Sequence, residues 1–153
     1  MRQAGSDCRG GAGAKQYLSY VGGAPFQPAV AYALNSEEDW VNALRDSLQA
    51  KRDRLSTALT ELGFGVHDSA GTYFLCADPR PLGYSDSTQF CAELPRRAGG
   101  VAAIPMSAFC DPHSPPHIGE WNHLVRFAFC KRDDTLDEAI RRLGALESGR
   151  DLS

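Results

Sequence analysis

Arg126 is the side chain in this sequence that is best suited to bind an anion. It lies within Leu124–Cys130, where side chains alternate as they do in a half-buried β-strand. One face of that strand, which must pack against the core, carries Val125, Phe127 and Phe129. We expect Arg126 on the opposite face, beside the apolar residues Leu124 and Ala128.

A guanidinium group in such apolar surroundings is costly to bury without a partner of opposite charge. Two interpretations of Arg126 therefore remain open. In the first, an internal Asp or Glu side chain, or solvent, satisfies the arginine, and its role is structural. In the second, the planar guanidinium fork binds the carboxylate of an anionic ligand in a bidentate manner.

A second group of residues with possible chemistry lies just before this strand. Its members are Cys110, His113, His117 and His123. The Cys-x-x-His-x-x-x-His spacing is one that zinc sites can use. Three prolines stiffen the segment, however, and no second cysteine pair completes a tetrahedral set. We therefore expect no bound metal here.

A long amphipathic helix is the strongest element that could position these residues. Ser36 is its expected N-cap, followed by acidic side chains that favour a helix N-terminus, and Gly63 is its expected end. Its apolar stripe recurs at helical spacing and consists of Trp40, Leu44, Leu48, Leu55, Leu59 and Leu62. We expect Trp40 to anchor this helix in the core.

The remaining pattern predicts an α/β protein with an α+β layout. A helix opens near Pro25 and runs to about Leu34. Short strands are expected at 64–67, 72–77, 101–104 and 124–130. Further helices are expected at 87–94, ended near Pro95, and at 135–146. The predicted fold is a long helix and a C-terminal helix packed on a sheet of about three or four strands, antiparallel or mixed.

Composition excludes several classes of function. The 153 residues carry a net charge of -3, and no stripe of Lys and Arg marks a nucleic-acid partner. No apolar run is long enough to span a membrane, and the Gly-rich start is not a secretory signal. We interpret the five cysteines as reduced core thiols of a cytoplasmic protein.

Three sequence blocks, in order, resemble the fold-type I aminotransferases of class I and II, which depend on pyridoxal 5'-phosphate. The blocks are Gly71–Phe74 followed by Asp78, Gly100–Phe109, and Val125–Lys131. The last resembles the family strand (Leu/Val)-Arg-Phe-x-Phe-x-Lys, whose arginine binds the substrate α-carboxylate. The resemblance implies that role for Arg126, with an amino acid and a 2-oxo acid as substrates.

Within the family, the segments 15–20, 26–29 and 73–84 are most similar to the kynurenine-aminotransferase-like branch, and particularly to bacterial N-succinyldiaminopimelate aminotransferases. That likeness implies a role in lysine biosynthesis and a homodimer. In such enzymes the loop matching Tyr20, Gly22 and Gly23 reaches the neighbouring subunit's active site. A plain turn between helices is an equally open interpretation of this loop.

The sequence also departs from the family. The family's cofactor lysine lies in a Ser-x-x-Lys context, which none of Lys15, Lys51 and Lys131 shares. We therefore expect residues 1–14 to be a disordered or non-family extension, 15–35 a remnant of large-domain helices and the interdomain segment, and 36–148 the small domain. No cofactor-binding or catalytic residue is expected in this chain, whose large domain is missing. It would be inactive alone; the alternative is a catalytically dead aminotransferase-like module for binding or dimerisation.

Overall fold

The computed structural model describes Leu18, residues 23–110 and residues 121–146. Contacts divide the chain into two compact units, residues 1–43 and 44–153. The second unit contains the sheet and Arg126. No helix in the described part of the chain is long and apolar enough to cross a membrane.

The first unit is helical, and none of its described side chains is buried. A 3-10 turn, η1 (Ala24–Phe26), leads into α2 (Gln27–Ser36). Its exposed apolar side chains are Phe26, Val30, Tyr32, Leu34, Trp40 and Val41. Trp40 is 60% exposed, so the prediction that it anchors the long helix in the core is wrong. The apolar stripe of that helix is therefore longer than the part of the helix that packs against the core of the described residues.

The long helix α3 (Glu38–Glu61) begins later than predicted. Ser36 is still the last residue of α2, and the Glu37 N–H caps that helix by donating to the Ala33 carbonyl at 3.0 Å. Ser36 is therefore not the N-cap of α3, because its backbone is already helical. Acidic residues do occupy the first turn of α3, as the sequence predicts.

The C-terminal end of α3 forms the cap that Gly63 predicts. Gly63 adopts a left-handed backbone with φ of 89°. Its N–H donates to the Thr60 carbonyl at 2.9 Å, and the Phe64 N–H donates to the Leu59 carbonyl at 3.0 Å. This is the Schellman arrangement, which a glycine adopts without strain. It turns the chain directly from the helix into the sheet.

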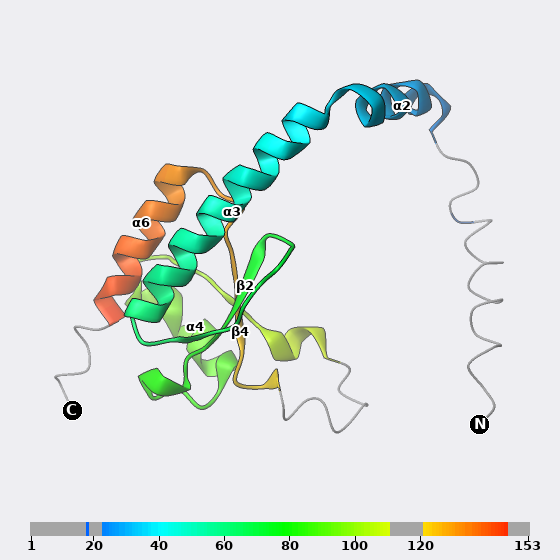
Figure 1. The fold of residues 1–153 in the computed structure, drawn as a ribbon. Coiled ribbons are helices and arrows are strands. Elements are labelled where there is room, and N and C mark those ends of the chain that lie inside the picture. The colour runs from blue at the N-terminus through cyan, green and yellow to red at the C-terminus, as the bar shows by residue number, and fades with distance from the viewer. Residues whose placement is uncertain (1–17, 19–22, 111–120, 147–153) are drawn as a thin grey trace. The chain divides into compact units, whose positions relative to one another are not determined.

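The sheet is antiparallel throughout, with the strand order β1-β2-β4-β3. Its strands are β1 (Gly65–Val66), β2 (Phe74–Asp78), β3 (Ile104–Pro105) and β4 (Val125–Ala128). The two central strands, β2 and β4, bring together the first and last of the three family-like blocks (Figure 1).

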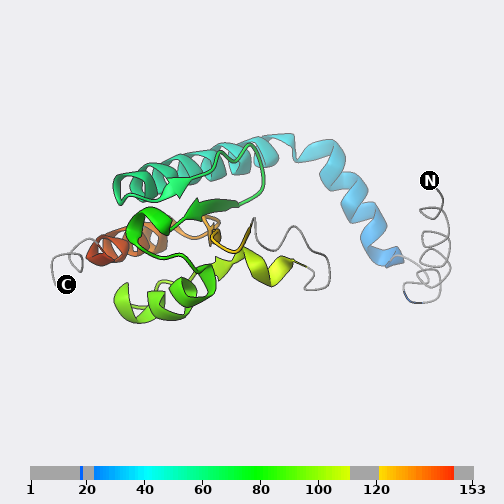
Figure 2. The same cartoon turned by 90° about the horizontal axis from the view of Figure 1, so that it is seen from below.

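Three helices, α3, α4 (Ser87–Arg97) and α6 (Asp133–Leu143), cover one face of this sheet. Figure 2 shows α6 lying between α3 and α4. They form one core with alternate residues of β2 and β4: Leu55, Leu59, Phe64, Leu75, Ala77, Phe90, Leu94, Ala98, Val125, Phe127, Phe129, Leu136 and Leu143. The α+β layout is therefore confirmed, with helices on one face of the sheet.

Ion pairs also join α3 to α6. Arg54 contacts Asp133 at 2.7 Å and Asp137 at 3.3 Å, and Lys51 lies 3.7 Å from Asp133. Asp133 is in the first turn of α6, where the helix dipole also favours a negative charge. Apart from Lys51, the side chains of these pairs are exposed to solvent. Each pair therefore contributes little to stability.

The predicted end of α4 at Pro95 is wrong, since the helix continues to Arg97. Pro95 lacks an N–H and so removes one helical hydrogen bond. Bonds from the residues that follow are present: the Ala98 N–H donates to the Leu94 carbonyl at 2.8 Å, and the Gly100 N–H donates to the Pro95 carbonyl at 2.7 Å. The helix begins at Ser87, as predicted, and the Asp86 side chain caps it by accepting from backbone N–H groups of the first turn.

Short 3-10 turns complete the second unit, namely η2 (Arg80–Leu82), η3 (Met106–Phe109) and η4 (Gly144–Leu146).

The expectation for Leu124 is wrong, because this residue is 3% exposed and does not lie on an open face beside Arg126. Its N–H donates to the Trp121 carbonyl in a turn that precedes β4. The alternation of the strand therefore begins only at Val125.

Candidate anion-binding site

The sheet face opposite the helices positions Arg126. In the register of the sheet, Arg126 stands opposite Cys76 on β2 and opposite Ile104 on β3. Residues opposite one another in an antiparallel sheet project from the same face. Phe74 and Ala128 form the next pair on that face. The buried neighbours of Arg126 along β4 point the other way, into the core.

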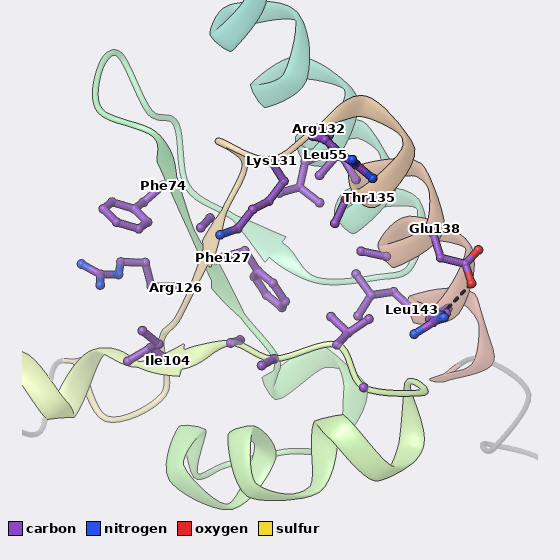
Figure 3. Close-up of a pocket in the computed structure, with 18 of the residues that line it drawn as sticks. Leu55, Phe74, Ile104, Arg126, Phe127, Lys131, Arg132, Thr135, Glu138 and Leu143 are labelled. Atoms are coloured by element: carbon purple, nitrogen blue, oxygen red, sulfur yellow. Dashed lines mark hydrogen bonds and ion pairs between the residues drawn. The ribbon is translucent and has the colours of Figure 1, made fainter.

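Two aromatic rings enclose the guanidinium of Arg126. Its Cζ atom lies 3.9 Å from the ring centroid of Phe74 and 4.0 Å from that of Phe109. Phe74 comes from β2, and Phe109 is the last residue of η3. Figure 3 shows Phe74 and Arg126 together on the side of β4 away from Phe127. The charge is thus held by ring faces, an arrangement that attracts arginine strongly.

No carboxylate pairs with Arg126 in the part of the chain that the structure describes. Its Nε is buried and has no hydrogen-bond partner there. The interpretation in which an internal Asp or Glu satisfies Arg126 therefore fails for the described residues. An arginine without a carboxylate partner, on an open face, keeps its charge available for an anionic ligand.

Asp78 is an acid on the same strand as Phe74, and it is already engaged elsewhere. It accepts from Arg80 at 2.7 Å, and His123 Nε2 lies 3.9 Å away. Burial opposes ionisation of Asp78, but the hydrogen bonds and charge of Arg80, together with His123, outweigh it and lower the carboxyl pKa. Asp78 therefore stays ionised and holds the end of β2, and its charge is shared with these two partners.

The cysteines are less buried than a core assignment requires. Cys76, Cys91 and Cys110 are partly buried and Cys130 is exposed, while Cys8 lies outside the described residues. Burial raises the pKa of the Cys76 thiol, although the charge of Arg126 opposes the shift. The side chain opposite Arg126 on β2 is therefore a neutral thiol near neutral pH, and it does not compete for the guanidinium.

A cavity of about 720 Å³ adjoins Arg126 on the β3 side of β4. Its inner lining is apolar and includes Leu55, Val101, Phe127, Leu136 and Leu143. Charged side chains around it include Lys131, Arg132 and Glu138, while Arg126 and Phe74 lie at one end (Figure 3). The volume falls in the range of small-molecule sites.

Comparison with known proteins shows which family the chain belongs to. The family model of class I and II aminotransferases matches residues 13–143. The chain belongs to this family. It is 74% identical over 136 residues to a probable N-succinyldiaminopimelate aminotransferase of Mycobacterium tuberculosis, covering 87% of this chain and 34% of that protein. It is 39% identical over 132 residues to the methionine aminotransferase of Escherichia coli, covering 86% and 32%.

Solved aminotransferase structures share the fold. The structure of N-succinyldiaminopimelate aminotransferase from Mycobacterium tuberculosis superimposes with a TM-score of 0.76 at 75% identity, covering 88% of this chain and 33% of that one. The resemblance predicted from the three sequence blocks is confirmed. This chain spans about a third of the length of the relatives that it matches.

The class I and II aminotransferases use pyridoxal phosphate, but the described residues do not fit this cofactor. A lysine is needed to bond it. Lys51 lies on α3 and pairs with Asp133, while Lys131 follows β4 and lines the cavity. Neither belongs to the row of side chains on the open face, and Lys15 lies outside the described residues.

The other predicted sites are only partly described. Gly23 precedes η1 and is exposed, and a Cβ there would meet the Phe26 ring at 2.9 Å. Tyr20 and Gly22 lie outside the described residues, so the loop's reach towards a second subunit stays a prediction. His113 and His117 also lie outside them, and the described residues contain no group of potential metal ligands.

Sequence reasoning missed the part that Phe74 and Phe109 play. Both residues belong to family-like blocks, but neither was expected to contact Arg126. For Phe74 a signal was present, because alternation along Phe74–Asp78 separates it and Cys76 from the buried residues. No local pattern indicated Phe109, whose ring reaches Arg126 from a separate 3-10 turn.

Proposed function

We propose that this chain is the substrate-binding small domain of a pyridoxal-phosphate-dependent aminotransferase, with Arg126 binding the substrate α-carboxylate. The observation that carries the proposal is an arginine on the open sheet face without a carboxylate partner among the described residues. Such an arginine can donate two parallel hydrogen bonds to a ligand carboxylate. The family membership supplies the reaction, transfer of an amino group between an amino acid and a 2-oxo acid.

Within that reaction, the residues of this chain would bind and orient the substrate. A bidentate contact at the carboxylate fixes both the position and the rotation of the α-carbon, which a single point charge does not do. Pyridoxal phosphate supplies the electron sink when bound. Its lysine and phosphate ligands are assigned to no residue here, and we expect the chain alone to be inactive.

The proposed substrate is N-succinyl-diaminopimelate, in lysine biosynthesis in the cytoplasm. This choice is supported by the name and 74% identity of the Mycobacterium tuberculosis relative. In the same proposal, residues 15–35 are a remnant of large-domain helices, and 36–148 form the small domain. The loop with Tyr20, Gly22 and Gly23 would approach a second subunit of a homodimer.

The decisive experiment restores a complete enzyme. Residues 15–146 replace the matching segment of the Mycobacterium tuberculosis relative, and transamination is measured for Arg126→Ala and Arg126→Lys. Because charge-assisted hydrogen bonds are worth about 1.5–3 kcal/mol each, Arg126→Ala should lower kcat/KM by about 10²–10⁴-fold. Arg126→Lys should recover part of the loss, since it restores charge without the fork.

The control is an amine substrate that lacks the α-carboxylate. Its kcat/KM should fall far less in both variants, because it makes no contact with the guanidinium. An equal fall for both substrates would mean that Arg126 supports the fold, and the proposed role would be rejected. Unchanged kinetics with both substrates would equally reject it.

A further inference from the structure

The contacts of Arg126 differ from those of Arg80 and Arg142. Arg80 donates from Nε and Nη2 to the Asp78 carboxylate, so those donors are already used. Arg142 similarly donates from Nε to Glu138. Arg126 is held only by ring faces in the described part of the chain, at 3.9 and 4.0 Å. The described residues thus contact its guanidinium through ring faces and accept no hydrogen bond from it.

The two rings also determine which edge of Arg126 remains accessible. Both rings pack on the guanidinium, with their centroids 3.9 and 4.0 Å from Cζ, so a ligand must approach along an edge that the rings leave uncovered. Nε is buried without a partner, whereas the Nη groups are not among the buried unpaired atoms of the described residues. The accessible edge is therefore the one formed by Nη1 and Nη2, which points away from β4 in Figure 3.

We propose that Phe74 and Phe109 are positioning residues, which clamp Arg126 so that its Nη edge binds the ligand carboxylate end-on. The inference rests on the proposed function and adds to it the residues that orient the arginine. A carboxylate partner would fix the guanidinium equally well, but it would compete with the ligand for the same donors. Aromatic faces orient the charge and leave every N–H free.

The clamp also makes the site selective for flat anions. A planar carboxylate presents two oxygens to the Nη edge that the rings leave uncovered. The neighbouring side chains on this face, Cys76 and Ile104, add no charge. The ligand class is therefore a carboxylate whose adjoining carbon can rest against apolar and aromatic surface.

Side-chain NMR on the whole 153-residue chain tests the clamp. The Nε–H signal of Arg126, assigned by its loss in Arg126→Lys, is followed during titration with 2-oxoglutarate. Phe109→Leu removes one ring, Phe109→Tyr restores an aromatic face, and Phe74→Leu tests the other ring. Phe26→Leu is the matched control, because Phe26 is 71% exposed in the first unit. Backbone amide spectra report whether each variant keeps its fold.

In the unmodified chain we expect the Arg126 signal to be shifted by the ring currents and to move further when 2-oxoglutarate binds. Phe109→Leu should reduce the ring-current shift and weaken binding by about 2- to 30-fold, the range that one such cation–π contact spans. Phe109→Tyr should retain both, Phe74→Leu should act like Phe109→Leu, and Phe26→Leu should change neither.

Two results would overturn the inference, and they are distinguishable. If 2-oxoglutarate binds at Arg126 with unchanged affinity in folded Phe109→Leu and Phe74→Leu chains, the clamp is wrong and the proposed function stands. If the Arg126 signal of the unmodified chain does not respond to 2-oxoglutarate at saturating concentration, Arg126 is not a carboxylate site. The proposed function and the clamp then fail together.

Discussion

Truncation of two adjacent residues of β4 should change the stability by very different amounts. Phe127 is 4% exposed and packs edge-to-face on Phe64, with ring centroids 5.9 Å apart. Phe127→Ala should therefore lower the free energy of unfolding by about 3–5 kcal/mol, through lost burial and the cavity left behind. A domain of this size is stable by about 5–15 kcal/mol, so this loss is a large share of the total.

Arg126→Ala should change the same free energy by less than about 1 kcal/mol. It removes two cation–π contacts, worth about 0.5–2 kcal/mol each. It also removes a buried Nε without a partner, whose desolvation costs about 1–3 kcal/mol. These two terms are of similar size and opposite sign, so the substitution should be nearly neutral.

Urea unfolding of both variants and the unmodified chain, followed by circular dichroism, measures the two changes. The slopes should stay equal, because the surface exposed on unfolding is nearly the same. Phe127→Leu serves as a milder core variant and should lie between the unmodified chain and Phe127→Ala. If Arg126→Ala cost as much as Phe127→Ala, Arg126 would be a packing residue, and the division of β4 into a core face and a binding face would be wrong.

Three further outcomes are expected. Hydrogen bonds from Arg141 and Arg142 lower the pKa of Glu138 to about 2, so its ion pairs should stabilise the fold fully above about pH 4.5 and be lost as pH falls towards 2. Urea midpoints across that window should depend less on pH in Glu138→Gln. Burial raises the pKa of Cys91 to about 11, so iodoacetamide at neutral pH should alkylate exposed Cys130 before Cys91, as mass spectrometry would show. Pyridoxal phosphate followed by borohydride should leave no lysine of this chain stoichiometrically modified; one mapped adduct would contradict the proposed inactivity.

Much of the second unit could be predicted from local sequence. Alternation along β4 separated the buried residues from Arg126, because a strand has a period of two wherever one face is covered. Gly63 marked the end of α3, since the left-handed cap favours glycine. These features depend on a few consecutive residues, and a local pattern is sufficient to determine them.

Other helix boundaries could not be predicted, because they depend on which of several competing hydrogen bonds form. Ser36 had the chemistry of an N-cap, but the helix before it continued far enough to include it. Pro95 removed one hydrogen bond, which was too little to end a helix whose next turn kept its own bonds. The stripe through Trp40 showed that α3 is amphipathic, but a stripe does not reveal how much of its length is covered.

Neither interpretation of Arg126 from the sequence predicted the residues that surround it. The two interpretations considered an acid of the chain, solvent or an anionic ligand as the partner of Arg126. The structure supplies another kind of partner, two ring faces brought in by β2 and η3. An arginine paired with a carboxylate is stable whether or not a ligand binds. An arginine held by rings still has unused donors, so a carboxylate that reaches its Nη edge gains hydrogen bonds and displaces no internal acid. The proposal that Arg126 binds a carboxylate therefore rests on its surroundings, and not on its charge alone.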